Sequence, residues 1–160
     1  MSGSGILNVD IQLYLSVYDQ LKLAVAGLDE EQLKRKEAPG KWSITEVLAH
    51  LADHNIVVSF RIREILAGSD KTLPGFAQDP WVEGQRANES DVSELLDAYA
   101  ALLHYNAVLF RRLTEEDWEK TGVNFKGETV TLASVVNAFT AHVQTHLAQI
   151  ERIKSRVAAV

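Results

Sequence analysis

The chain contains no cysteine. This absence excludes disulfide bonds, thiolate zinc sites, iron–sulfur clusters and a cysteine nucleophile, because each of them needs a thiol side chain. The sequence also lacks any apolar run near the roughly 20 residues that cross a bilayer, since Asp10, Asp53 and Arg61 interrupt the best candidates. We therefore expect a soluble, cytoplasmic protein with no membrane partner.

Glycine and proline are scarce, with 9 and 3 residues among 160. Hydrophobic residues make up 46% and charged residues 24%, which excludes a disordered, collagen-like or low-complexity chain. Residues 1–5 lack the basic and apolar segments of a secretory signal, so we expect them to be disordered or artificial. Residues 6–160 are predicted to form a single domain with a substantial core.

Basic residues are outnumbered by acidic ones. The chain has 16 Lys and Arg residues and 22 Asp and Glu residues, which gives a formal net charge of −6. A surface of this sign repels a phosphate backbone, so we expect a small-molecule substrate and no nucleic-acid partner.

Four segments carry apolar residues at spacings of three and four, the pattern of an amphipathic helix. Predicted helices run from about residue 8 to 28, from Ser43 to Gly68, from Asp91 to Leu113, and from Thr131 toward the end of the chain. No segment shows a strand alternation of useful length. The sequence therefore predicts an all-α four-helix bundle.

The segment between Gly68 and Ser90 is too long for a tight turn. It is also too apolar, at Phe76 and Trp81, for a solvated linker. We expect a crossover loop between the second and third helices that lies over one end of the bundle. Residues 28–33 echo residues 113–118, and a helix with a His-x-x-x-His pair follows each, which suggests two related helix pairs.

Four of the five histidines form two pairs, His50 with His54 and His142 with His146. Residues four apart share one helix face, so two imidazoles can bind one metal ion. His142 and His146 also lie on the apolar stripe, where an imidazole needs a partner. His104 lies off its stripe and is expected at the surface. The alternative to a metal is a hydrogen bond across the core to one of Tyr14, Tyr18, Asn55, Tyr99 and Asn106.

Two known metal templates are excluded by the residues between these histidines. Val143 follows His142, so the His-Glu-x-x-His motif of zinc proteases is absent. The Glu-x-x-His motif of di-iron bundles is absent too, because Val47, Phe139 and Val143 stand where it needs glutamate. A nitrogen-rich site for one divalent ion remains, and imidazole suits zinc, nickel, copper and iron alike.

Two stretches of the chain, 40–53 and 141–150, resemble the DinB-like superfamily, and the loop 67–81 and the turn 116–118 extend the likeness. The resemblance implies a four-helix bundle with a divalent metal site of three histidines. It places one ligand on the second helix and two on the fourth, which are His50, His142 and His146.

Periodicity and resemblance disagree on the second helix. The apolar stripe turns His54 inward sooner than His50, whereas the resemblance places the ligand at His50. We follow the resemblance, because this helix is apolar nearly all round and its stripe is poorly defined. His54 is then a fourth ligand, a hydrogen-bond donor behind the ligands, or an acid/base group.

The resemblance implies several activities, since members include thiol S-transferases, a mycothiol-dependent isomerase and candidate metal-dependent hydrolases. We expect metal-dependent transfer of a low-molecular-weight thiol cosubstrate to an electrophile, because the chain supplies no thiol of its own. Hydrolysis by a metal-bound water and a non-catalytic bundle with a structural metal are the alternatives. Apolar residues expected at the surface, namely Val17, Leu23 and Val108, predict a homodimer.

Overall fold

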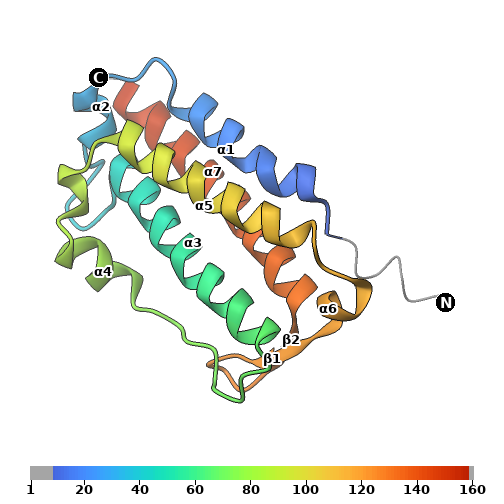
Figure 1. The fold of residues 1–160 in the computed structure, drawn as a ribbon. Coiled ribbons are helices and arrows are strands. Elements are labelled where there is room, and N and C mark those ends of the chain that lie inside the picture. The colour runs from blue at the N-terminus through green and yellow to red at the C-terminus, as the bar shows by residue number, and fades with distance from the viewer. Residues whose placement is uncertain (1–8, 159–160) are drawn as a thin grey trace.

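Four long helices form a bundle in the computed structural model of the chain, which describes residues 9–158 (Figure 1). They are α1 (Ile11–Val25), α3 (Ile44–Leu66), α5 (Val92–Phe110) and α7 (Leu132–Ala158). The predicted fold class is therefore confirmed, while the tail 1–5 lies outside the described residues. The shorter elements are α2 (Glu30–Lys34), α4 (Gln78–Gly84), the 3-10 helix η2 (Ala87–Glu89), α6 (Glu115–Glu119), β1 (Thr121–Val123) and β2 (Thr129–Thr131).

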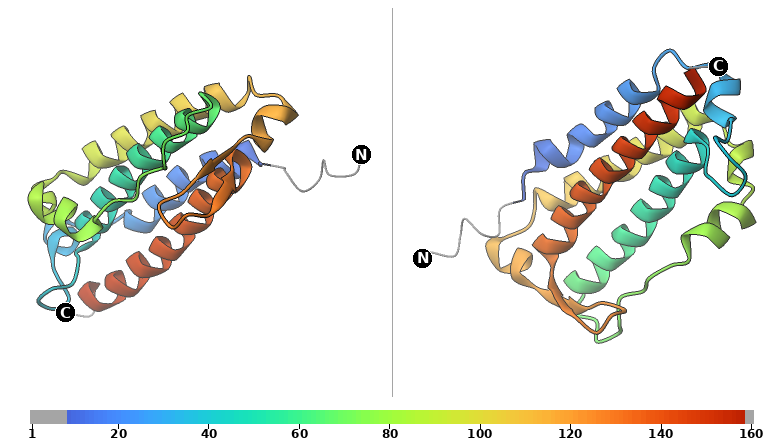
Figure 2. Two further views of the ribbon diagram at one scale, coloured as in Figure 1. Left: turned by 90° about the horizontal axis from the view of Figure 1, so that it is seen from below. Right: turned by 180° about the vertical axis from the view of Figure 1, so that it is seen from behind.

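The order of the helices around the bundle differs from their order in the chain. α3 packs against α5 and α7, and α1 packs against the same two helices, so α1 and α3 lie on a diagonal. Figures 1 and 2 show that α3 and α5 run in one direction and that α1 and α7 run in the other. Because α3 and α5 are parallel neighbours, the chain between them has to return along the whole bundle.

This return segment, residues 69–90, is called the strap here. The predicted long crossover between the second and third long helices is confirmed, but it follows the side of α3 rather than lying over one end of the bundle, and it contains α4 and η2 (Figure 1). Val82 and Ala87 of the strap are buried against Ala49 of α3. Burial of these two apolar side chains holds the strap on the bundle.

A two-stranded hairpin between α6 and α7 was not predicted. β1 and β2 pair antiparallel with Thr121 opposite Thr131, and three residues per strand are too few for a visible alternation. The hairpin also holds the strap, since the Leu73 amide donates to the Val123 carbonyl over 2.7 Å.

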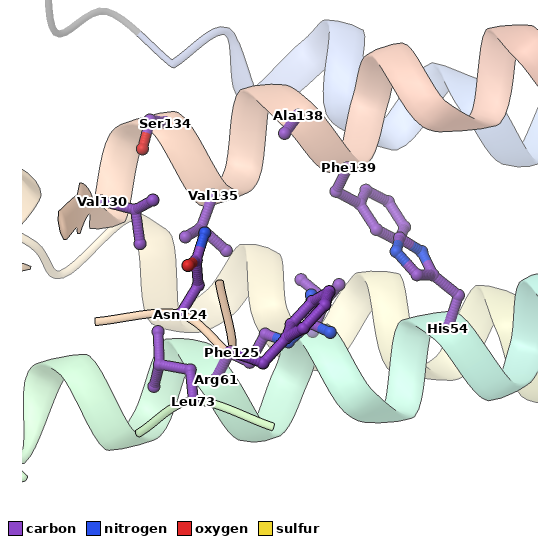
Figure 3. Close-up of a pocket in the computed structure, with 11 residues that line it drawn as sticks. His54, Arg61, Leu73, Asn124, Phe125, Val130, Ser134, Val135, Ala138 and Phe139 are labelled. Carbon is purple, nitrogen blue, oxygen red and sulfur yellow. The ribbon is translucent and has the colours of Figure 1, made fainter. Parts of the chain in front are cut away.

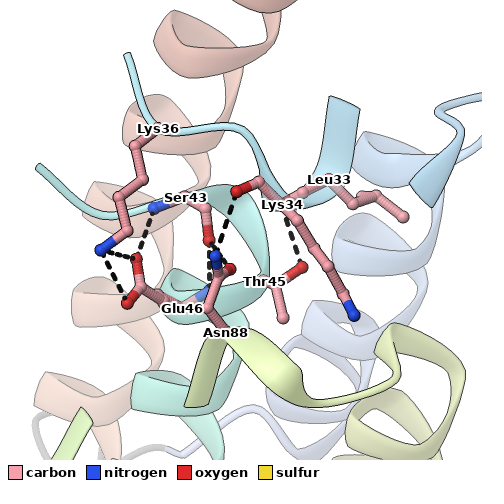
Figure 4. Close-up of polar contacts among 7 residues, drawn as sticks. All are labelled: Leu33, Lys34, Lys36, Ser43, Thr45, Glu46 and Asn88. Atoms are coloured by element: carbon pink, nitrogen blue, oxygen red, sulfur yellow. Dashed lines mark hydrogen bonds and ion pairs between the residues drawn. The ribbon is translucent and has the colours of Figure 1, made fainter. Parts of the chain in front are cut away.

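The start of α3 is surrounded by protein on all sides, and every residue from Ile44 to Asp53 is buried. The predicted capping box is present: the Glu46 amide donates to Ser43 Oγ over 3.1 Å, and the Ser43 amide donates to Glu46 Oε1 over 2.9 Å (Figure 4). Ser43 Oγ donates in turn to Asn88 Oδ1 over 2.6 Å, and Lys36 pairs with the Glu46 carboxylate at 3.2 Å. This helix has no exposed face along its first turns, which explains why its apolar stripe was ill defined.

The internal echo has a structural counterpart. α2 and α6 both begin with a capping box, at Asp29 and at Thr114, and each precedes a long helix that carries a histidine pair.

The predicted surface residues divide into two groups. Val17 is fully buried in the core, so its assignment to the surface is wrong, whereas Leu23 and Val108 are exposed. On α5 the periodicity is partly right: Tyr99 and Asn106 are buried as it predicts, but Leu96 and Leu103 are buried too, while Leu95 and Leu102, which it also places inside, are only half-buried. No helix between residues 9 and 158 combines the length and the apolar character needed to span a bilayer.

Candidate metal centre

Three histidines from two antiparallel helices meet in the interior of the bundle. His50 comes from α3, and His142 and His146 come from α7; one ring nitrogen of each lies within 4.8 Å of those of the other two. His54 lies beside this triad, with its ring centroid 4.1 Å from that of His142 and 6.1 Å from that of His50. The structure therefore brings His50 into the triad, as the resemblance implied, and leaves His54 next to it.

The ring nitrogens of the triad are poorly satisfied by the protein itself. His50 is only 1% exposed, and neither of its ring nitrogens has a hydrogen-bond partner among the described residues. Buried polar atoms without partners are costly and rare in folded proteins. A ligand that accepts lone pairs from these nitrogens would remove this cost.

A neighbour sets the tautomer of the neutral His146 ring. Its Nδ1 lies 2.8 Å from Gln149 Oε1, which can only accept, so Nδ1 is the donor and, in the neutral ring, Nε2 carries the lone pair. His146 Nε2 lies 3.1 Å from His142 Nε2. Gln149 thus holds His146 in the tautomer and orientation in which Nε2 can bind a metal, as hydrogen-bond partners of ligating histidines do.

The spacing of the nitrogens fits one small cation. Two nitrogens about 2.1 Å from a tetrahedral ion lie about 3.4 Å from each other. The Nε2 atoms of His142 and His146 are already at 3.1 Å, and the His50 nitrogen, within 4.8 Å of the other two ligand atoms, exceeds the tetrahedral separation by at most about 1.4 Å. The donor set of three imidazoles is typical of catalytic zinc and related ions, which retain an open coordination position.

Aromatic side chains shield the triad from water. Phe76 of the strap stacks on His50 with ring centroids 5.8 Å apart, and Trp81 packs edge-on against Phe76 at 4.8 Å. Phe139 of α7 stacks on His54 at 5.7 Å with nearly parallel rings. The strap therefore contributes directly to the low-polarity surroundings of the site.

Burial shifts the titration of these histidines strongly. Desolvation, together with a smaller effect of the neighbouring imidazoles, lowers the pKa of His50 to about 3 and that of His142 to about 4. The same causes lower the pKa of His54 to about 2. These imidazoles are consequently neutral at pH 7, which is the form that coordinates a metal.

A cavity of about 310 Å³ opens next to His54 (Figure 3). It lies between α3 and α7 and is covered by the hairpin turn with Asn124 and Phe125. Gly75 of the strap admits this turn, because a Cβ at that position would lie 2.9 Å from the Phe125 ring. Strap and hairpin together thus enclose a space for a small molecule beside the triad.

Comparison with known proteins identifies the family. The sequence profile of the DinB superfamily matches residues 13–150. The chain belongs to the DinB superfamily.

Relatives in this superfamily include proteins named as candidate metal-dependent hydrolases. One from Bacillus licheniformis is 31% identical over 142 residues, which cover 86% of this chain and 78% of the relative. Another from Geobacillus thermodenitrificans is 27% identical over 139 residues, covering 86% and 78%.

Solved structures show the same fold. YfiT from Bacillus subtilis, described as a candidate metal-dependent hydrolase with an unusual four-helix bundle topology, superposes with a TM-score of 0.84 at 24% identity. The superposition covers 92% of this chain and 85% of YfiT. The mycothiol-dependent maleylpyruvate isomerase superposes with a TM-score of 0.68 at 13% identity and covers 89% of this chain and 61% of that one.

The hydrogen bonds across the core that were the alternative to a metal are not formed in this DinB-superfamily member. Asn106 Nδ2 donates to Tyr14 Oη over 3.0 Å, and none of the five expected partners bonds a ring nitrogen of the triad in the described part of the chain. His104 is exposed, as predicted. The role of Gln149 was missed, although its position three residues after His146, on the same helix face, was a usable signal.

The lowered histidine pKa values predict that the metal-free protein loses stability in acid. An unfolded histidine titrates near pH 6.5, whereas folded His50 titrates near pH 3, so the unfolded state binds more protons as the pH falls below 6.5. At pH 5 the buried His50 alone should lower the free energy of unfolding by on the order of 2 kcal/mol relative to pH 7. Urea unfolding of chelator-treated protein at pH 7 and pH 5 measures this loss.

Two variants distinguish the contribution of His50 from those of other titrating groups. One such group is Asp53, whose raised pKa makes the folded state more stable, not less, as the pH falls. His50→Leu should flatten the pH dependence, while the exposed His104→Ala should leave it as in the wild type. Equal stability of the wild type at the two pH values, together with no flattening in His50→Leu, contradicts the prediction.

Proposed function

We propose that this protein is a metal-dependent enzyme in which His50, His142 and His146 hold one divalent ion. The observation that carries the proposal is a fully buried imidazole, His50, with two unpartnered nitrogens beside two further imidazoles. Relatives of this chain are named as candidate metal-dependent hydrolases, which supports a metal-dependent reaction.

A divalent ion bound by three neutral imidazoles keeps its full charge and lowers the pKa of a water or thiol that it binds. The protein supplies the orientation: Gln149 fixes His146, and the Phe76 and Phe139 rings limit access of water. His54 lies between the triad and the cavity, where a substrate would contact its ring.

Thiol transfer is the reaction that we favour. The chain has no cysteine, and no carboxylate is among the described residues that line the cavity, so neither a thiolate nor a carboxylate of the protein can act there as the nucleophile. A low-molecular-weight thiol meets this requirement, and the similar fold of a mycothiol-dependent isomerase supports it. Hydrolysis is the second candidate, favoured by the names of the relatives.

The metal proposal predicts the effect of removing each ligand. His50→Ala, His142→Ala and His146→Ala should each weaken zinc binding by more than about 100-fold, because each removes one of three ligands. Titration calorimetry with zinc, after removal of bound metal by a chelator, measures this affinity.

His104→Ala is the matched control and should bind zinc like the wild type. His54→Ala should also retain a full equivalent, because His54 lies outside the group of three. A full equivalent of tightly bound zinc in both His142→Ala and His146→Ala would falsify the site.

The thiol proposal predicts turnover only when metal and thiol are both present. Metal-loaded protein is incubated with cysteine, glutathione or bacillithiol and a chloroaromatic or epoxide electrophile, and loss of the electrophile is followed. The expected result is thiol conjugation that a chelator abolishes and that His142→Ala lacks. Metal-dependent cleavage of ester or amide substrates without any thiol supports hydrolysis instead and contradicts thiol transfer.

The cytoplasmic location and the homodimer stay predictions. Exposed Leu23 and Val108 are compatible with a dimer interface.

A further inference from the structure

The cavity beside the triad has one charged side chain on its walls. Of the residues that line it, only Arg61 is charged at neutral pH, while the walls are otherwise largely apolar, with Val58, Leu73 and Val135 among them. His54 at the other end of the α3 wall is neutral. Figure 3 shows His54 and Phe139 at one end of the cavity and Arg61 on the α3 wall beneath Phe125.

Arg61 is a cation without a counter-ion in the protein. Its Nε donates to the Pro74 carbonyl over 2.8 Å, which fixes the guanidinium against the strap. No carboxylate of residues 9–158 lies within ion-pair distance of Arg61, and its two terminal nitrogens form no hydrogen bond to a described residue. Burial accordingly lowers the pKa of Arg61 from its usual value. Arg61 is half-buried and lines the cavity, so its unbonded terminal nitrogens are free to pair with an anion that enters this space.

Asn124 and Ser134, two other polar side chains of the cavity, already have partners. Asn124 accepts the amides of Lys126 and Glu128 and donates to the Glu128 carboxylate, all within the hairpin turn. Ser134 donates to the Thr131 carbonyl and accepts the Thr131 amide. Neutral His54, at the end next to the triad, and the Arg61 guanidinium are therefore the groups left to recognise a polar ligand, and of these two only the guanidinium is a cation.

We propose that this cavity binds a small organic carboxylate, whose carboxylate pairs with Arg61 while its apolar chain or ring lies against Val58, Val135 and Phe139. A planar carboxylate matches the two terminal nitrogens of a guanidinium, which it can engage in a bidentate pair. A volume of about 310 Å³ is at the lower end for ligand pockets and suits a molecule of about one aromatic ring with a short chain.

Together with the proposed function, on which this step rests, the geometry defines a class of substrate. Arg61 lies seven residues after His54 on α3, about 10 Å along the helix axis. A carboxylate held at Arg61 would place atoms several bonds away beside His54 and the triad. The substrate class is thus an electrophile that carries a carboxylate at the end remote from its reacting carbon.

The test compares two probes of the same shape, 4-phenylbutyrate and its neutral analogue 4-phenylbutanol, on metal-free protein by titration calorimetry. The wild type should bind the carboxylate in a saturable way and at least about tenfold more tightly than the alcohol, because a charge-assisted pair is lost in the alcohol. Arg61→Gln should lose this preference by about 10- to 100-fold, and Arg61→Lys, which keeps the charge but not the planar fork, should lie between.

Two further variants test whether the two probes bind in this cavity. Arg152→Gln removes an exposed arginine of α7 outside the cavity and should bind both probes like the wild type. Ala138→Phe fills the cavity from an exposed helix position and should abolish binding of both probes, even if Arg61→Gln does not fold. A carboxylate preference that survives in Arg61→Gln, unchanged binding in Ala138→Phe, or no binding to the wild type overturns the assignment.

Because this experiment uses metal-free protein, it tests the carboxylate site independently of the metal proposal. If the metal proposal fails, the carboxylate still binds through Arg61. If metal binding and turnover are found but the Arg61 variants bind the carboxylate like the wild type, only the assigned substrate class is wrong.

Discussion

The burial of His50 against two imidazoles of α7 is the constraint on which the centre of this molecule depends. A neutral imidazole that is shielded from water and has no partner on either nitrogen lowers the stability of the folded protein. A ligand bound to these nitrogens would offset this loss. Its position follows from the burial of α3 on all sides over the first ten residues of that helix. The helix that holds the histidine thus also removes it from solvent.

The parallel arrangement of α3 and α5 explains the other parts of the site. Because these neighbours run in the same direction, the chain returns along the bundle through the strap, and this return brings Phe76 onto His50 and Pro74 onto Arg61. The hairpin then pairs with the strap at Leu73 and covers the cavity with Phe125. One topological requirement therefore supplies both the aromatic shield of the triad and the wall of the adjacent cavity.

The sequence predicted the four helices well, because the periodicity of each extends over many turns and the cap at Ser43 is explicit. It predicted less where contacts with distant parts of the chain determine the local structure. The strap acquires its helices by packing on Ala49, and the two short strands exist only as a pair. The ligand on α3 could not be chosen from periodicity, since a helix buried on every side has no apolar stripe. Arg61 was overlooked because only the fold shows that no carboxylate faces it, although its position seven residues after His54 places both on one face.

The coordination number of a bound ion tests the central claim most directly. X-ray absorption spectra of the zinc-loaded wild type and of zinc-loaded His54→Ala report the number and distance of the imidazole ligands. Both proteins should show three imidazole nitrogens at about 2.0–2.1 Å, with the remaining coordination supplied by the oxygen of water or another exogenous ligand. Two or fewer imidazoles in the wild type, or the loss of one imidazole in His54→Ala, would contradict a centre built from His50, His142 and His146.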